Sequence, residues 1–386
     1  MNILFYFISQ INPRRGGTER VADNIAHGLQ TRGYNVYYMS RIAIPGKYDI
    51  SCFFLPDTNG VTERNINFIN NFCRENAINI IINEAGNTDD VYLFSNEHIK
   101  GVKIITELHF CPMQSLRYYY RSLNLPLKLR NPKEFIINLL KWAKVPLNRM
   151  MHYHNFCTNY QYMYEHSDKV IVLSPSYIQE FVKMAGVENT SKIISIYNPN
   201  TFTIANSLCR KEKIVLFMGR LQYAPKRVDY LLDIWKSIQP NHNDWILQIC
   251  GSGDYKLSLE AYVKQHNIKG VSFEGNVAPQ PFYEKASIMC MTSLNEGMPM
   301  VIVEAMQCGV VPLVYDTYSA AKDLISDGET GFVIPPFDKS KYVKKLSLLM
   351  DNEDLRINMG VKAMQSTSRF ELDSIINQWE KLIREI

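Results

Sequence analysis

The sequence has no apolar run near the roughly 18–20 residues that a membrane-spanning helix needs. Its apolar start, residues 2–8, has no basic residues before it and no small-residue cleavage site after it. This predicts a first strand instead of a signal peptide. The eight cysteines include no Cys-x-x-Cys pair, so neither a zinc site nor a disulfide framework is indicated, and reduced thiols in the cytoplasm are expected. A net charge of only +4 argues against a protein that binds nucleic acid over its whole surface.

A chain of 386 residues with 46% apolar and 21% charged residues is typical of a globular protein with two domains. Strand-like runs alternate with helical patterns, which indicates α/β layers with parallel sheets. The expected strands of the first half are Ile3–Ile8, Asn35–Met39, Ile50–Leu55, Ile78–Ile82, Lys103–Thr106, Lys169–Leu173 and Ile193–Ile196. Those of the second half are Ile214–Met218, Trp245–Cys250, Val271–Phe273, Ile288–Met291, Val311–Val314 and Phe332–Ile334.

Asn198-Pro199-Asn200 interrupts this alternation, and the polar residues up to Lys213 indicate a linker between two Rossmann-like halves. The sequence therefore predicts a first domain over residues 1–200 and a second over residues 201–368. A final helix is expected over residues 369–386.

The stretch from Glu296 to Glu304 places two carboxylates around a glycine loop and the start of a short helix. The apolar run Ala286–Met291 predicts a buried parallel strand before it, and Gly309 is a helix-stop signal after it. Pro299 suits the first helical position, and the free N–H groups of a helix start suit an anion such as a phosphate. Glutamates beside a helix start are also common without a function, which is the alternative.

The first half carries two weaker candidates at the ends of expected strands. Gly16 and Gly17 open a helix where glycine lets the backbone approach a ligand closely, although the pattern is not Gly-x-Gly-x-x-Gly and a plain tight turn is the alternative. His109 follows a strand at the edge where α/β proteins bind ligands. A structural or solvent-exposed histidine is the alternative there.

In the second half, Arg220 directly follows a strand and Lys226 comes six residues later, which places two cations at the carboxyl edge of the sheet. Arginine binds phosphate oxygens bidentately and lysine binds them as a point charge, so the pair could hold a diphosphate without a metal. Gly251-Ser252-Gly253 ends the next strand as a second small-residue turn, and its Gly-x-Gly says little alone.

Residues 114–155 interrupt the α/β alternation and concentrate positive charge. Eight basic residues face the single acid Glu134, so this segment carries +7 and the rest of the chain about −3: Arg117, Arg121, Lys128, Arg130, Lys133, Lys141, Lys144 and Arg149. Tyrosines 118–120, Trp142 and the apolar run 135–140 are interleaved, which suits a surface that meets anionic lipid headgroups. A solvated basic insertion, or helices packed on the sheet, is the alternative. No nucleic-acid-binding module frames the patch.

Taken in order, Gly16-Gly17, Arg220 with Lys226, Gly251-Ser252-Gly253 and Glu296 to Glu304 resemble the family 4 glycosyltransferases of the GT-B fold. The likeness spans the chain from Asn2 to the final helix, and the basic insertion is its least familiar part. It implies an α/β protein with two Rossmann-like parallel-sheet domains that face a central cleft. It also implies a retaining transferase whose nucleotide-sugar donor lies in that cleft, and a final helix that crosses back to the first domain.

The resemblance implies catalytic roles for His109, Arg220, Lys226 and Glu296. It implies donor-binding roles for Gly16, Gly17, Arg220, Lys226, Gly251, Gly297, Met298 and Glu304. Arg220 and Lys226 would neutralise the diphosphate, since charge builds there as the glycosyl–phosphate bond breaks. Glu304 would accept hydrogen bonds from the ribose, and Glu296 and His109 would meet the donor sugar. The family lacks an Asp-x-Asp metal site and none is evident here, so neither a metal nor another cofactor is expected.

The basic insertion favours a glycan or lipid-linked acceptor, with the enzyme peripheral on the inner face of the cytoplasmic membrane. The variant Glu296-Gly297-Met298-Pro299-Met300 resembles family members that build bacterial surface polysaccharides. A UDP-sugar that carries a hexose or N-acetylhexosamine is the expected donor, with GDP-mannose as the alternative, and no nucleic-acid partner is expected. Two other functions stay open: a nucleotide-sugar epimerase of the same fold, and a non-catalytic protein that binds membrane or nucleic acid.

Overall fold

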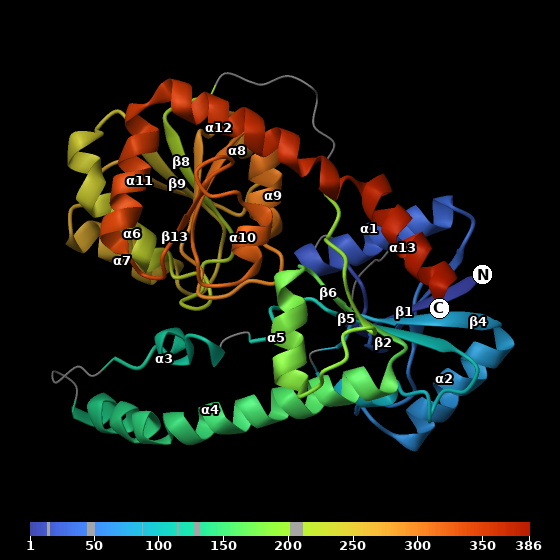
Figure 1. Cartoon of the computed structure of the whole chain (residues 1–386). Coiled ribbons are helices and arrows are strands. Elements are labelled where there is room, and N and C mark those ends of the chain that lie inside the picture. Colours follow the sequence, from blue (N-terminus) through green and yellow to red (C-terminus); the bar gives the residue numbers. More distant parts are fainter. Residues whose placement is uncertain (14–15, 45–50, 87, 114–115, 127–131, 201–210) are drawn as a thin grey trace. The chain divides into compact units, whose positions relative to one another are not determined.

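The computed structural model describes residues 1–13, 16–44, 51–86, 88–113, 116–126, 132–200 and 211–386, which form two compact units (Figure 1). The first unit comprises Met1–Met113, Met151–Thr201 and Arg369–Ile386. The second comprises Gln114–Met150 and Phe202–Ser368. In each unit helices flank a parallel sheet, as the alternating sequence pattern predicts.

Within the described residues, the first unit has a seven-stranded sheet in the order β3-β2-β1-β4-β5-β6-β7, with all pairs parallel. Its strands are β1 (Asn2–Ser9), β2 (Asn35–Ile42), β3 (Phe53–Phe54), β4 (Ile78–Asn83), β5 (Lys103–Leu108), β6 (Lys169–Val172) and β7 (Ile193–Ser195). Its helices are α1 (Gly17–Thr31), α2 (Glu63–Glu75), the short η1 (Asp89–Leu93), α5 (Ser176–Ala185) and α13 (Leu372–Glu385).

The second unit has a six-stranded parallel sheet in the order β10-β9-β8-β11-β12-β13, again counted over the described residues. Its strands are β8 (Ile214–Met218), β9 (Ile246–Cys250), β10 (Val271–Gly275), β11 (Ile288–Met291), β12 (Val311–Tyr315) and β13 (Phe332–Ile334). Its helices include α6 (Val228–Ile238), α7 (Lys256–Gln265), α8 (Gln280–Lys285), α9 (Met300–Gln307), α10 (Ala320–Leu324), α11 (Lys339–Asp351) and α12 (Glu353–Ser366).

In both sheets the strand order reverses beside the first strand of the unit. The reversal falls between β1 and β4 in the first sheet and between β8 and β11 in the second. Loops that leave the carboxyl ends of such neighbouring strands diverge, which opens the crevice where α/β proteins bind ligands. These two points are where the functional side chains have to be sought.

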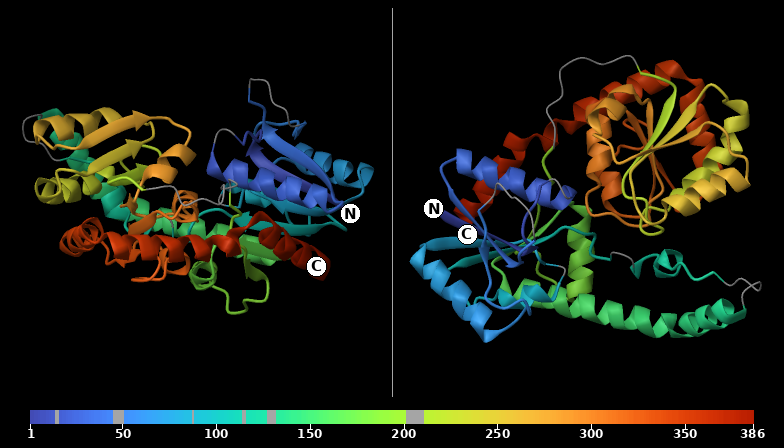
Figure 2. Two further views of the ribbon diagram at one scale, coloured as in Figure 1. Left: turned by 90° about the horizontal axis from the view of Figure 1, so that it is seen from above. Right: turned by 180° about the vertical axis from the view of Figure 1, so that it is seen from behind.

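Helix α13 packs on helix α1, so residues from the two ends of the sequence share one core (Figure 2, right). Its apolar face buries Ile375, Ile376 and Trp379, because apolar residues recur there at helical spacing. Gly28 of α1 permits the close approach, since a Cβ at this position would lie 2.5 Å from the Cδ1 of Ile376.

The insertion contains the short helix α3 (Tyr119–Ser122) and the 35-residue helix α4 (Pro132–His166). Helix α4 continues through Pro146 and passes from the second unit into the first between Met150 and Met151. The sequence analysis placed the whole insertion in the first domain, whereas the structure groups 114–150 with the second unit. Within the described residues, no helix has both the length and the apolar character needed to cross a membrane.

The sequence-based prediction of a two-domain parallel α/β fold is confirmed, and a strand lies in each of the thirteen expected places. The expected strand Ile50–Leu55 shrinks to the two residues of β3, and its first residue lies outside the described residues. Most of the expected linker, residues 201–210, also lies outside them. Pro299 is not the first helical residue: it is extended and precedes α9, which begins at Met300.

Candidate active site

The loop after β8 carries Arg220, a cation that the sequence assigned to the diphosphate. Its side chain is exposed and has no hydrogen-bond or ion-pair partner among the described residues. Gly219 before it has a φ of +150°, a conformation that favours glycine, and the ideal Cβ position of Gly219 lies 3.9 Å from the Nζ of Lys226. The two predicted phosphate ligands therefore belong to one local structure.

Lys226 forms an ion pair with Glu296, with 2.6 Å between Nζ and Oε1. Both side chains are largely buried, at 14% and 12% exposure, so water screens the pair only partly. The pair joins the loop after β8 to the loop after β11, which are the loops at the reversal point of the second sheet. Sequence reasoning placed these residues on two different parts of the donor and did not predict that they contact each other.

Glu304 lies on α9, one turn after its start, and is only 2% exposed. The hydroxyl of Tyr283, on α8, donates a hydrogen bond to Oε2 of this carboxylate over 3.0 Å. Tyr283 is itself fully buried, so the hydroxyl fixes the orientation of Glu304. Sequence reasoning missed Tyr283, because nothing in the Gln280–Lys285 pattern separates it from an ordinary core tyrosine. Gly297 and Met298 lie in the loop between the two glutamates.

Gly251 and Gly253 have φ angles of +143° and +154°, and both are needed for packing. A Cβ on Gly251 would overlap the carbonyl oxygen of Gly219, and a Cβ on Gly253 would overlap that of Leu221. The N–H of Leu221 donates to the oxygen of Ser252 over 2.8 Å. The loop after β9 thus supports the loop that carries Arg220, a structural role that the sequence analysis did not foresee.

In the first unit, Gly16 precedes α1 and Gly17 begins it. A Cβ added to either glycine would meet nothing within 4 Å, and neither has a positive φ. Packing and backbone strain therefore do not explain these two glycines, which leaves open space at a helix start beside the reversal point of the first sheet. Arg14 and Arg15, which precede them in sequence, lie outside the described residues.

His109 lies at the end of β5 in a buried cluster with Glu84 and Glu107. Its Nε2 is hydrogen-bonded to the Oε2 of Glu84, and its Nδ1 lies 3.7 Å from the Oε1 of Glu107. Burial and the nearby Glu84 charge raise the pKa of Glu107 to about 8. Burial lowers the pKa of His109, but the attraction of Glu107 and Glu84 outweighs it and raises the value to about 9.

Sequence reasoning missed both glutamates of this cluster. Glu84 directly follows β4 and Glu107 lies on β5, so the rule that found His109 at a strand end could have found them too. Within the described residues, these three side chains form the one group of three or more His, Cys, Asp or Glu whose ligand atoms lie within 4.8 Å of one another.

The first part of the insertion packs on the second unit next to the Lys226 loop. The guanidinium of Arg121 stacks on Phe337 at 3.9 Å, and its Nη1 donates to the hydroxyl of Tyr230 over 3.1 Å. Arg227 donates from Nη1 to the carbonyl of Arg121 over 2.8 Å and stacks on Tyr230 at 3.7 Å. Arg121 is therefore fixed by protein contacts and is not a freely solvated cation.

Helix α4 exposes an apolar stripe, defined here as Ile136, Leu139, Leu140, Leu147, Met150 and Met151, each between 49% and 62% exposed. At 100° per residue these positions share one face, whereas the buried Asn138 and Val145 lie on the opposite face. Lys133, Lys141 and Lys144 flank the stripe on one side. Lys128 and Arg130 of the predicted basic patch lie outside the described residues.

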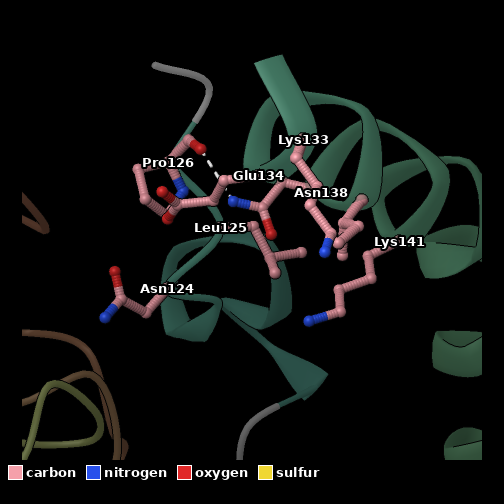
Figure 3. A pocket seen from close by; sticks show the side chains of 8 residues that line it. Asn124, Leu125, Pro126, Lys133, Glu134, Asn138 and Lys141 are labelled. Atoms are coloured by element: carbon pink, nitrogen blue, oxygen red, sulfur yellow. Dashed lines mark hydrogen bonds between the residues drawn. The ribbon is translucent and has the colours of Figure 1, made fainter. Parts of the chain in front are cut away.

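A pocket of about 460 Å³ lies at the start of α4, between this helix and residues 124–126 (Figure 3). Lys133 and Lys141 contribute amines to it and Glu134 a carboxylate. The Nδ2 of Asn138 donates to the carbonyl of Pro126 over 2.8 Å and closes one side. The pocket is polar and is remote in sequence from the Lys226–Glu296 pair.

The two parallel-sheet α/β units match solved glycosyltransferases of the GT-B fold. The pneumococcal O-GlcNAc transferase GtfA, solved with UDP and GlcNAc, matches with a TM-score of 0.73 over 100% of this chain and 99% of that one. The lipopolysaccharide outer core galactosyltransferase WaaB, in its apo form, matches with a TM-score of 0.72 over 100% and 99%. Sequence identities of 14% and 17% limit these likenesses to the fold.

Residues 202–366, less than half of the chain, match the family described as glycosyl transferases group 1. An uncharacterized glycosyltransferase of Haemophilus influenzae is 34% identical over 50% of this chain and 56% of its own length. A Campylobacter jejuni enzyme, named as an alpha-1,4-N-acetyl-D-galactosaminyltransferase that acts on a GalNAc-containing glycan linked to diphospho-undecaprenol, is 33% identical over 58% and 62%. The chain thus spans less than two thirds of these relatives. The expected glycosyltransferase resemblance and GT-B fold are confirmed, and membership of family 4 stays a prediction.

Proposed function

We propose that the protein is a retaining, metal-independent hexosyltransferase that uses a UDP-sugar and extends a lipid-linked glycan in bacterial surface polysaccharide synthesis. The observation that carries this proposal is the side-chain set at the reversal point of the second sheet. There Lys226 pairs with Glu296, and the exposed Arg220 has no partner within the described residues. An exposed cation beside a nearly buried ion pair suits a ligand that is anionic at one end and hydroxylated at the other.

Arg220 and Lys226 bind the diphosphate in this proposal. As the glycosyl–phosphate bond breaks, negative charge builds on the leaving group, and cations already in place stabilise it without the reorganisation that water would need. Glu304, oriented by Tyr283, accepts the ribose hydroxyls. Neither a metal ion nor another cofactor takes part, because the two side-chain cations supply the charge.

Glu296 binds a hydroxyl of the donor sugar after it exchanges its contact with Lys226 for that hydroxyl. His109 meets the sugar from the first unit, and the backbone at Gly16 and Gly17, where an added Cβ would meet nothing within 4 Å, meets the phosphates. Retention of the anomeric configuration rests on the resemblance. The alpha linkage in the name of the Campylobacter relative supports it.

UDP is favoured over GDP because the pneumococcal structural neighbour was solved with UDP and GlcNAc. The lipid-linked acceptor is favoured because the Campylobacter relative is named for a substrate on diphospho-undecaprenol. The names of the relatives favour glycosyl transfer over the epimerase reaction.

The apolar stripe of α4 and its lysines favour attachment to the inner face of the cytoplasmic membrane. An amphipathic helix with a basic flank lies in the interface and places its apolar face at the boundary of the acyl chains. Soluble proteins rarely expose apolar residues so densely without a partner. A peripheral location would bring the enzyme to a lipid-linked acceptor.

The proposal is tested by incubating the protein with UDP-sugars and GDP-mannose, with and without a membrane extract that supplies lipid-linked glycans. We expect transfer from one UDP-sugar only when acceptor is present, at an undiminished rate in EDTA, and an alpha linkage by NMR. A second sugar isomer formed from donor alone would identify the epimerase. Loss of transfer in EDTA, restored by magnesium or manganese, would overturn the metal-independent mechanism.

A further inference from the structure

The cluster of Glu84, His109 and Glu107 brings together three buried titratable side chains, and the resemblance assigns a role to only one of them, His109. The three side chains are 1%, 4% and 2% exposed, respectively. They lie at the ends of the neighbouring strands β4 and β5, which are joined in parallel register up to Asn83 and Thr106. The cluster therefore sits at the edge of the first sheet where ligands bind.

The two glutamates stand in different relations to the imidazole. Glu84 is hydrogen-bonded to Nε2, whereas 3.7 Å between Nδ1 and the Oε1 of Glu107 is too long for a hydrogen bond. The Nδ1 of His109, the Oε1 of Glu84 and the Oε2 of Glu107 are buried without a hydrogen-bond partner among the described residues. Two buried carboxylates with one cation would leave a charge uncompensated, which is costly away from water.

We propose that Glu84 and Glu107 are positioning residues that hold His109 as an imidazolium, with Glu84 as the bonded carboxylate and Glu107 as a neutral carboxylic acid. In this state one buried negative charge and one buried positive charge cancel. His109 then brings a fixed positive charge to the sheet edge, and it needs no proton uptake during the reaction. The consequence for turnover rests on the proposed glycosyl transfer, but the protonation state itself does not.

The titratable groups around the cluster agree with this arrangement. The pKa of Glu107 is raised by burial first and by Glu84 second, and that of His109 is raised by both glutamates against the effect of burial. Tyr38, on β2, also lies near the cluster. Burial raises the pKa of Tyr38 most, Asp23 raises it next, and the charge of Glu84 adds to the rise. Asp23, on α1, accepts a hydrogen bond from the Tyr38 hydroxyl over 3.3 Å.

The direct test follows the imidazole signals of His109 by NMR from pH 5 to pH 10, assigned by their loss in H109N. We expect wild-type His109 to be charged at pH 7 and to lose its proton at least one pH unit above an ordinary histidine. E84Q removes the bonded carboxylate and should lower the titration midpoint of His109 by at least one pH unit. In E107Q, His109 should still be charged at pH 7. A wild-type His109 that is neutral at pH 7 overturns the proposal, and this result needs no variant to fold.

The kinetic test compares kcat/KM from pH 6 to pH 9 for wild type, E84Q and E107Q. E107Q imitates the protonated acid, so its kcat/KM should lie within about threefold of the wild-type value at pH 7. Any change in kcat/KM that wild type shows near pH 8 should be absent from E107Q. E84Q should fall at least tenfold at pH 7 and recover partly at pH 6. If E84Q and E107Q lost kcat/KM equally and at every pH, the different roles proposed for Glu84 and Glu107 would be contradicted. If no transfer is found at all, the proposed function fails while the NMR result still stands.

A metal ion is the rival occupant of the cluster, because two carboxylates and an imidazole are also ligands for zinc and manganese. Thermal shift with added zinc or manganese separates the two readings. A rise in melting temperature that is lost in both E84Q and E107Q would overturn the proton-holding cluster. Absence of such a shift, together with a charged His109, supports it.

Discussion

Among single residues, the Lys226–Glu296 ion pair would join the anion-binding end of the proposed site to its sugar-binding end. Each of the two charges has the other as a partner, at 2.6 Å, and both side chains are largely buried. A diphosphate on Lys226 would repel the Glu296 carboxylate, so donor binding should break this pair and free Glu296 for a sugar hydroxyl.

Removing a cation should therefore reduce turnover far more than stability. For R220A and K226A we expect a loss of transition-state stabilisation of about 3–4 kcal/mol, because preplaced charges act on the leaving group. K226A should be the less stable of the two, since it removes the ion pair between Lys226 and Glu296. Steady-state kinetics and chemical denaturation measure both effects. K236A, an exposed lysine on α6, is the matched control. Activity within about twofold of wild type in R220A would refute its role.

The two glutamates should fail differently. E304A should weaken free UDP and intact UDP-sugar alike, by roughly ten- to a hundredfold, because a lost hydrogen bond to a charged group costs about 1.5–3 kcal/mol. E296A should leave UDP affinity nearly unchanged and reduce turnover. Titration calorimetry with UDP separates the two roles, and Y283F, which removes only the orienting hydroxyl, should lie between wild type and E304A. Equal loss of UDP affinity in E296A and E304A would contradict the assignment.

The buried cluster of the first unit predicts a pH dependence of stability. The pKa of Glu107 rises from 4.5 to about 8 on folding, and that of His109 from 6.5 to about 9. A raised pKa contributes stability that is fully present below the unfolded value and is lost as pH rises through the folded value. The free energy of unfolding of the first unit should therefore fall between about pH 5 and pH 9. Chemical denaturation of wild type and E107Q tests this, and the E107Q profile should be flatter.

At the scale of elements, helix α4 makes the clearest prediction. The double variant L140S/L147S should weaken binding to anionic liposomes by about 2 kcal/mol, or roughly thirtyfold. The reason is that each leucine is about half exposed, so burying it at the acyl boundary contributes about 1 kcal/mol to binding. Replacing Lys133, Lys141 and Lys144 by glutamine should remove mainly the salt-sensitive part of liposome binding. Co-sedimentation measures both. L257S on α7 is the matched control, since that leucine is 77% exposed outside the stripe. Unchanged binding in L140S/L147S would show that the stripe stays out of the bilayer.

Elements and single residues differ in how much the sequence reveals about them. Strands such as Ile214–Met218 and Ile288–Met291 were predicted to the residue, because continuous apolar runs bounded by polar loops suit buried parallel strands. The Lys226–Glu296 contact was not predictable, because seventy residues separate the two and only the strand order makes them neighbours. The packing role of Gly251 was hidden for a similar reason, since it depends on the backbone of a neighbouring loop.

At the scale of the whole molecule, residues near the end of the chain should stabilise the unit in which the chain begins. W379A on α13 should cost the first unit about 3–5 kcal/mol, because a large, fully buried side chain leaves a cavity. The loss should appear in the hydrogen exchange of α1 and leave β11 in the second unit unchanged. N377A, an exposed neighbour on the same helix, is the matched control. A loss of protection spread evenly over both units would show that they unfold as one.

The return of α13 to α1 also bears on the order in which the molecule can be made. During synthesis α1 leaves the ribosome before α13, but it packs on that helix, which is encoded some 340 residues later. The unit that is translated first is therefore completed after the second unit, whose residues end at Ser368. Throughout that interval the nascent protein carries an uncovered hydrophobic face, which is a natural binding site for a chaperone.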